Sequence, residues 1–377
     1  MTARIFDFLA ERRPETPCLV IDLEAIEANY LELQRLLPLA RIHYAVKANP
    51  APEILARLVR LGAHFDAASL GEIDLCLAAG ATPDRISFGN TIKKQRDIAA
   101  AYERGVRLFA FDSDAELDKL AEAAPGASVF CRVLMDCEST DRPLSRKFGC
   151  APAMAAALML RAGERGLDPR GLSFHVGSQQ TSLKPWDIGV RAVARLFRRL
   201  RADGLEPRMV NLGGGFPVTY RGMPAPSLAE HAAAAMAAVT RHFGNDLPEM
   251  IVEPGRALAG NAGVIQAEVV LIARKSYTDR KRWVYLDIGR FGGLAETMDE
   301  SIKYPIQTGR DGGEVGPVIL AGPTCDSADI LYEKAHYLMP LDLRVGDKVE
   351  ILSAGAYTSS YASVGSNGFA PLKTYCI

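Results

Sequence analysis

Residues 42–68 read IHYAVKANPAPEILARLVRLGAHFDAA, and this stretch decides the fold class. The apolar run Ile42–Lys47 is typical of a buried strand, and Pro52–Leu61 has the apolar periodicity of a helix. Gly62 stands where a helix ends in a left-handed residue, and a second apolar run, His64–Ala68, follows it. A strand, a helix and a further strand in this order predict two parallel neighbouring strands.

The same alternation continues to residue 253. The apolar runs are Ile42–Lys47, His64–Ala68, Arg85–Gly89, Arg107–Phe111, Ser128–Met135, Leu172–Val176, Arg208–Leu212 and Met250–Glu253. Helical segments lie between them, several ending at a glycine, and Ser113 and Ser227 are expected to cap two of them. Eight strands, each but the last followed by a helix, favour a closed (β/α)8 barrel of the TIM type over an open doubly wound sheet.

After Ala259 the pattern changes to strands with little helix between them. The runs are Ile265–Ile272, Arg282–Asp287, Val315–Leu320 and Lys348–Leu352. The prediction is therefore an α/β plus β chain with two domains. Residues 23–260 form the barrel domain, in which a helix over Leu23–Leu37 precedes the first strand. Residues 1–22 and 261–377 form a β-rich, sandwich- or barrel-like domain, completed by the N-terminal strand Cys18–Asp22.

Composition excludes several classes of protein. The 377 residues are 48% hydrophobic and 24% charged, as in an ordinary folded protein rather than a disordered one. The net charge of -1 argues against a nucleic-acid partner, which calls for a concentrated positive field. The seven cysteines include no C-x-x-C pair, so we expect neither a disulfide framework nor a metal site. A reducing, cytoplasmic location is the simplest expectation. No apolar segment approaches the ~20 residues that span a bilayer, so no membrane association is expected.

Polar residues and glycines gather where the predicted barrel strands end. They are Lys47 at the end of the first strand, Asp66 in the second, His175 and Ser178 at the end of the sixth, Gly213, Gly214 and Gly215 at the end of the seventh, and Glu253, Gly255 and Arg256 at the end of the eighth. Barrels of this kind build their catalytic site at the carboxyl ends of the strands, commonly with a phosphate site after strands seven and eight. We therefore expect these residues to meet at one mouth of the barrel.

Each of these residues also has a plainer interpretation. Lys47 is either a surface lysine or, with its pKa lowered by desolvation, an amine that forms a Schiff base. The glycine run 213–215 is either a tight turn or a cradle for a phosphate, with Ser178 and Arg256 as further donors. The chain lacks the glycine fingerprints of nucleotide-binding loops.

The remaining candidates are open in the same way. Glu253 follows a buried run and needs either an arginine or a protonated ring nitrogen as its partner, and His175 either packs in the core or stacks on a flat ring. Cys325 lies in a turn-like segment and is by default an ordinary loop cysteine. The neighbouring carboxylates are either solvated or receive a substrate ammonium group: Asp326, Asp329, Glu296 and Glu300.

Six motifs in order resemble one family. They are HYAVKAN (43–49), FHVGS (174–178), GGGFP (213–217), EPGR (253–256), GPTCD (322–326) and GAYT (355–358). Together they are similar to the pyridoxal-phosphate (PLP) decarboxylases of the alanine-racemase-like barrel fold. Within that family the resemblance is greatest to the ornithine decarboxylases, including the bacterial lysine/ornithine type.

The resemblance implies a role for each matched residue. Lys47 would bind the cofactor through a Schiff base, with Asp66 beside it, His175 on the ring and Glu253 on the pyridine nitrogen. The phosphate would lie among the glycines of the 213–215 run and Ser178, Gly255, Arg256 and Tyr357. Cys325 would donate a proton, and Asp326 and Glu300 would contact the distal amine. Cys325 and Asp326 would reach the site from the partner subunit of a homodimer.

The implied reaction is the decarboxylation of a basic amino acid, foremost L-ornithine to putrescine and CO2, with lysine or dual lysine/ornithine specificity as the alternative. The barrel racemases place an arginine at the pyridine nitrogen, so Glu253 argues against a racemase. A non-catalytic regulator would lose cofactor residues, and a single-barrel PLP carrier would lack the second domain. The loop 136–148 does not match the family, so no arginine among Arg132, Arg142 and Arg146 is assigned to the ring.

Overall fold

The computed structural model describes residues 3–135 and 147–377. This part of the chain forms two compact units. One comprises Glu27–Pro217 and Ala225–Ala257, and the other comprises Met1–Ile26, Val218–Pro224 and Leu258–Ile377. No helix in the described part of the chain is long and apolar enough to cross a membrane.

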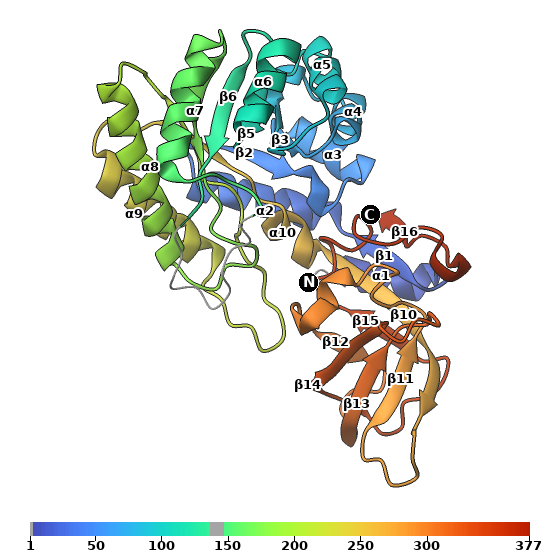
Figure 1. The fold of residues 1–377 in the computed structure, drawn as a ribbon. Helices are drawn as coiled ribbons and strands as arrows, with labels where there is room; N and C mark the ends of the chain where they lie inside the picture. The colour runs from blue at the N-terminus through green and yellow to red at the C-terminus, as the bar shows by residue number, and fades with distance from the viewer. Residues whose placement is uncertain (1–2, 136–146) are drawn as a thin grey trace. The chain divides into compact units, whose positions relative to one another are not determined.

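Eight parallel strands close into a barrel in chain order, which confirms the predicted TIM-type architecture (Figure 1). They are β2 (Ala40–Ala45), β3 (His64–Ala67), β4 (Ile86–Phe88), β5 (Leu108–Phe111), β6 (Ser128–Arg132), β7 (Asp168–Ser173), β8 (Met209–Asn211) and β9 (Glu249–Val252). The ring closes where β2 pairs with both β3 and β9. Ala110, Phe130, Met209 and Ile251 pack together as part of the barrel core.

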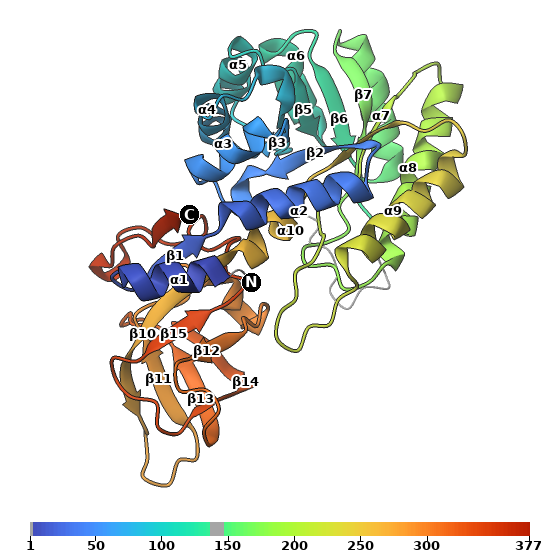
Figure 2. The same ribbon diagram turned by 180° about the vertical axis from the view of Figure 1, so that it is seen from behind.

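Helices follow the strands and lie outside the ring (Figure 2). They are α3 (Pro52–Arg60), α4 (Leu70–Ala78), α5 (Gln95–Glu103), α6 (Asp114–Ala123), α7 (Pro152–Glu164), α8 (Lys184–Ala202) and α9 (Leu228–Phe243), with α2 (Leu23–Leu36) before β2 and α10 (Arg256–Ala259) after β9. The predicted caps are confirmed, because the side chains of Ser113 and Ser227 accept backbone N–H groups of the first turns of α6 and α9. Gly62 has the expected left-handed φ of 79°.

The sixth barrel strand begins earlier than the sequence predicts. The apolar run suggested residues 172–176, whereas β7 spans Asp168–Ser173. Pro169 and Arg170 break the apolar pattern, but pairing with β6, in which Asp168 lies opposite Ser128, fixes the strand. His175 therefore lies in the loop after the strand rather than at its end.

The second unit is β-rich, as predicted. Its strands are β1 (Cys18–Ile21), β10 (Gly263–Ala273), β11 (Arg282–Leu286), β12 (Ile306–Thr308), β13 (Val315–Ala321), β14 (Ile330–Pro340), β15 (Lys348–Ile351) and β16 (Lys373–Cys376). Six of them follow the order β12-β15-β10-β11-β13-β14, and β1 pairs with β10 and β16. The sequence pattern missed three strands, β12, β14 and β16, and the helix α1 (Ala3–Arg12). β14 carries Glu333 and Lys334 at exposed positions within its length, which hides the apolar alternation.

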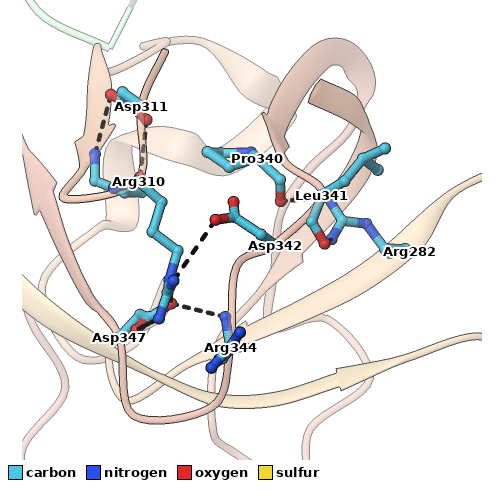
Figure 3. Close-up of polar contacts among 9 residues, drawn as sticks. Arg282, Arg310, Asp311, Pro340, Leu341, Asp342, Arg344 and Asp347 are labelled. Carbon is cyan, nitrogen blue, oxygen red and sulfur yellow. Dashed lines mark hydrogen bonds and ion pairs between the residues drawn. The ribbon is translucent and has the colours of Figure 1, made fainter. Parts of the chain in front are cut away.

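Arginines fix the turns of this unit, as Figure 3 shows. Arg310 forms ion pairs with Asp347 and Asp342. Arg282 donates to the main-chain carbonyls of residues 339–341, at the end of β14. These contacts hold the chain between β14 and β15.

Candidate active site

Lys47 lies immediately beyond β2, in a single 3-10 turn over Val46–Ala48. Its Nζ atom is 3.1 Å from Oδ2 of Asp66, which lies on the neighbouring strand β3. The lysine side chain is half exposed, whereas the aspartate side chain is buried. The lysine therefore presents an amine at the open end of the barrel, and the buried carboxylate of Asp66 holds that amine in place.

Asp66 is confined by the end of the next strand. A Cβ atom at Gly89 would lie 1.8 Å from Asp66 Oδ1, so no larger residue fits behind this carboxylate. Oδ1 is buried and has no hydrogen-bond partner among the described residues, so Oδ2 alone contacts Lys47. This carboxylate can therefore accept a further hydrogen bond in the site.

Glu253 follows β9 and is held by the ends of neighbouring strands. Asn211, at the end of β8, donates its side-chain amide to Oε1 of Glu253. The same asparagine accepts the N–H of Gly213 at 2.8 Å, and the N–H of Glu253 donates to the Gly213 carbonyl at 2.8 Å. The asparagine therefore couples the orientation of the glutamate to that of the glycine run.

The charged groups at this mouth act on one another. Burial raises the pKa of Glu253 to about 7, and the negative charge of Asp66 raises it further, whereas Lys47 and Arg132 oppose the shift. Burial also lowers the pKa of His175 to about 3, aided by the positive charges of Arg132 and Lys47. These mutual effects place the five side chains within electrostatic reach of one another. Four of them were expected at this mouth, and Arg132 was not assigned to it. His175 is therefore neutral at pH 7.

The glycine run packs directly against the two loops beside it. A Cβ atom at Gly214 would lie 2.5 Å from the Glu253 carbonyl oxygen. Gly215 has a left-handed φ of 102°, and a Cβ there would lie 2.5 Å from the carbonyl oxygen of Gly177. Ser178 is exposed in the loop after β7. The absence of side chains lets these loops approach one another closely, and main-chain N–H groups of such a glycine run are the kind of group that binds an anion.

The EPGR segment ends the barrel. The carbonyl of Pro254 accepts the N–H of Ala45 at 3.0 Å, which ties this segment to β2. Gly255 and Arg256 are both buried, and Arg256 begins α10.

Four predicted site residues lie in the second unit instead: Cys325, Asp326, Glu300 and Tyr357. Cys325 and Asp326 are exposed in the loop between β13 and β14. Tyr357 follows β15 and has a φ of 56°.

Two carboxylates of the expected acidic cluster bind backbone. Glu300 accepts the N–H groups of three consecutive residues of β14, at 2.6 to 2.8 Å. Asp329 is buried and accepts both the N–H and the hydroxyl of Thr324. Asp329 therefore shapes the loop that carries Cys325 and is not part of a solvated acidic surface. The contact between Glu300 and a substrate amine stays a prediction.

Two residues of the site escaped the sequence analysis. Arg132, at the end of β6, is left unassigned there, and Asn211 is not singled out at all. Both stand at the carboxyl ends of barrel strands, and that position was the signal available for them. The other two arginines considered, Arg142 and Arg146, lie outside the described residues, as does most of the 136–148 loop.

This site suits pyridoxal phosphate. The cofactor's aldehyde reacts with an amine, a carboxylate can hold a proton on its ring nitrogen, and closely packed main-chain N–H groups can bind its phosphate. Lys47, Glu253 and the glycine run 213–215 could provide these three groups. Among the described residues, no three side chains that could bind a metal ion lie close together. A barrel with this mouth and a separate β-rich unit defines the class of PLP enzymes with the alanine-racemase-like fold.

Comparison with known proteins gives the family. Residues 23–260 match the model of the pyridoxal-dependent decarboxylase, pyridoxal binding domain. The chain therefore belongs to the pyridoxal-dependent decarboxylases, and it is a PLP-dependent decarboxylase of basic amino acids.

Relatives with different substrates share most of the chain. It is 36% identical to the lysine/ornithine decarboxylase of Selenomonas ruminantium over 96% of this chain and 89% of the relative. It is 31% identical to the diaminopimelate decarboxylase of Vibrio cholerae over 85% of this chain and 78% of the relative. The solved lysine/ornithine decarboxylase of Vibrio vulnificus, in its cadaverine complex, is 30% identical with a TM-score of 0.88, over 100% of this chain and 98% of that one.

Proposed function

We propose that this protein decarboxylates L-ornithine to putrescine and CO2, with L-lysine as the alternative substrate. The relatives named above include lysine/ornithine decarboxylases, one of them solved with cadaverine and with putrescine. Asp326 stands next to Cys325 on an exposed loop, and a carboxylate there suits a distal ammonium group rather than a distal carboxylate. Ornithine and lysine differ by one methylene, which a pocket discriminates by only ~1–3 kcal/mol.

The observation that carries the decarboxylation in this proposal, as opposed to the choice of substrate, is the environment of Glu253. The cofactor supplies an electron sink for the bond that breaks. The ionised carboxylate of Glu253 would accept a hydrogen bond from the protonated pyridine nitrogen and keep the proton there, and the nearby positive charges of Lys47 and Arg132 favour this ionised form. A carboxylate at this position favours decarboxylation, whereas the arginine of the barrel racemases would leave the nitrogen without a proton.

The other residues at the mouth bind and orient. Lys47 Nζ would hold the cofactor at its aldehyde carbon, with loss of water, and Asp66 orients this lysine from 3.1 Å. His175 would pack against the cofactor ring. The main-chain N–H groups of the glycine run, with Ser178, Gly255, Arg256 and Tyr357, would hold the phosphate.

Cys325 delivers the proton to the substrate Cα after CO2 has left. Its thiol is exposed in the single chain, and a proton donor needs shelter from water to act from one side. This exposure supports a homodimer in which each subunit supplies Cys325 and Asp326 to the site of its partner.

The test is release of CO2 from four substrates: ornithine, lysine, arginine and meso-diaminopimelate. We expect the highest kcat/KM for ornithine, followed by lysine. A preference for diaminopimelate or arginine would overturn the substrate assignment. A cofactor-loaded protein that released CO2 from none of them would favour a non-catalytic regulator.

A further inference from the structure

Beneath the proposed phosphate site lies a buried contact between the two helices that follow β7 and β8. Trp186, in the first turn of α8, donates its indole N–H to Nδ1 of His231 in α9 at 3.0 Å. Both side chains are fully buried. Neither residue belongs to a motif that the sequence analysis singled out.

The chemistry of this bond fixes the state of the imidazole. An indole nitrogen can only donate, so Nδ1 must accept and the proton lies on Nε2. The Nε2 atom is buried without a well-formed hydrogen bond among the described residues, and it faces the backbone of Gln180. Burial lowers the pKa of His231, in keeping with a neutral ring.

Gln180 connects this histidine to the proposed phosphate loops. Its main-chain N–H donates to the carbonyl of Gly215 at 2.9 Å, and its side chain donates to the carbonyl of Val176 at 2.5 Å. It therefore joins the loop after β7, which carries Ser178, to the glycine run after β8.

Phe216 provides a second connection from the same contact. It directly follows the glycine run, and its ring centroid lies 5.1 Å from that of Trp186 and 6.4 Å from that of His231. The two loops thus rest on a buried trio of rings: Trp186, Phe216 and His231.

We propose that His231, through its hydrogen bond with Trp186, is a positioning residue that holds both loops in the geometry that binds the cofactor phosphate. The inference rests on the proposed function, because that function assigns the phosphate to these loops. The loops meet at a glycine whose Cβ would lie 2.5 Å from the opposite backbone. A small shift of the rings beneath them would therefore change the spacing of the N–H groups that face the phosphate.

The experiment compares PLP with pyridoxal, which lacks the phosphate. Dissociation constants are measured by absorbance for the cofactor-free wild type, His231→Phe, His231→Asn and Trp186→Phe. His231→Phe removes the acceptor and Trp186→Phe the donor, and we expect each to weaken PLP binding about tenfold while pyridoxal binding changes less than about twofold. His231→Asn keeps an acceptor near the Nδ1 position and should restore PLP affinity to within about threefold of wild type.

A matched control lies on the same two helices. His242 of α9 bonds through Nε2 to Asp187 of α8 at 2.9 Å, and His242→Asn should leave both affinities unchanged. The Trp186→Phe/His231→Phe double variant should bind PLP about as weakly as either single variant, because the two residues act through one bond. In a Trp283→Phe background Trp186 is the remaining tryptophan, and its emission should change when PLP binds.

Unchanged PLP affinity in both single variants, or equal losses for PLP and pyridoxal, would overturn the inference. Failure of the proposed function looks different. A wild type that bound PLP and pyridoxal equally well would place the phosphate elsewhere, whatever the variants did.

Discussion

The pKa of Glu253 depends strongly on the residues around it. Its usual pKa is 4.5, and desolvation raises it to about 7 despite the opposing charges of Lys47 and Arg132. The sequence indicated that this carboxylate follows a buried run and needs a partner. The sequence did not indicate Asn211 or Arg132 as neighbours of Glu253. Both residues lie on other strands, and contacts across a barrel cannot be predicted from local sequence patterns.

Replacement of Lys47 tests the attachment of the cofactor. In Lys47→Ala no amine remains to bind the aldehyde, so absorbance near the visible edge should be lost and turnover should fall to background. Lys94→Ala removes an exposed lysine of the same charge and should change neither. A Lys47→Ala protein that kept both absorbance and turnover would rule out this lysine as the attachment point.

Glu253→Gln tests the proton on the ring nitrogen. The amide has the same shape but cannot exchange that proton, so kcat should fall by about tenfold for each pK unit the nitrogen loses, with the cofactor still bound. Steady-state kinetics and absorbance measure the two effects. Loss of PLP binding without a defect in kcat would assign Glu253 to binding alone.

The same variant changes stability with pH in the cofactor-free protein. The native state keeps a proton on Glu253 up to a pKa of about 7, whereas the unfolded chain loses it near 4.5. The native state therefore binds more protons in this window, and the resulting stabilisation is lost as pH rises from 4.5 to 7. Denaturant unfolding should show the wild type losing stability relative to Glu253→Gln across this range. A constant difference would contradict the raised pKa.

At the scale of elements, the barrel strands bring the side chains of the candidate site to one end of the barrel, and the loops that follow the strands pack closely against one another. The sequence predicted the alternation of strands and helices, the serine caps and the glycines at which helices end. Each of these features depends on neighbours only a few residues away. The start of β7 could not be predicted from the sequence, because residues 168–170 join the strand through pairing with β6 rather than through their own apolar character.

Gly89→Ala tests one of these contacts. The added methyl would lie 1.8 Å from Asp66 Oδ1, so the carboxylate or the end of β4 must move and the ion pair with Lys47 must weaken. We expect weaker PLP binding and turnover lowered about tenfold or more, with the fold retained. Circular dichroism and a PLP titration would show this. The control is Gly71→Ala in α4, where the new Cβ meets only Ser69 Oγ at an ordinary 3.8 Å. Equal effects of both substitutions would contradict this account.

At the scale of the molecule, the chain divides its predicted site residues between two units. The amine, carboxylates and glycine run are in the barrel, and Cys325 and Asp326 are on an exposed loop of the β-rich unit. Asp329 shapes that loop from within, and a Cβ at Gly322 would lie 2.3 Å from its Oδ2. The proposed homodimer would place this exposed thiol and carboxylate in the site of the partner subunit.

Mixing an inactive variant with one of slower turnover tests this arrangement. Lys47→Ala and Cys325→Ala, equilibrated in equal amounts, should regain about a quarter of wild-type activity, because half the dimers are mixed and one site in each is intact. Lys47→Ala mixed with the Lys47→Ala/Cys325→Ala double variant should stay inactive. No recovery in the first mixture, despite subunit exchange shown by light scattering or labelling, would mean that each site draws on one chain.

The sequence by itself determined the barrel, the β-rich region after residue 259 and the strand ends at which the site is built. These follow from local periodicity, capping and chain order, which the residues carry with them. Only the tertiary structure decided that Arg132 and Asn211 lie near Glu253, that Asp329 and Glu300 bind backbone, and that Trp186 donates to His231 beside Phe216. Each of these depends on burial and on contacts between residues distant in the chain, and both exist only once the strands have closed into a ring and the sheet has formed.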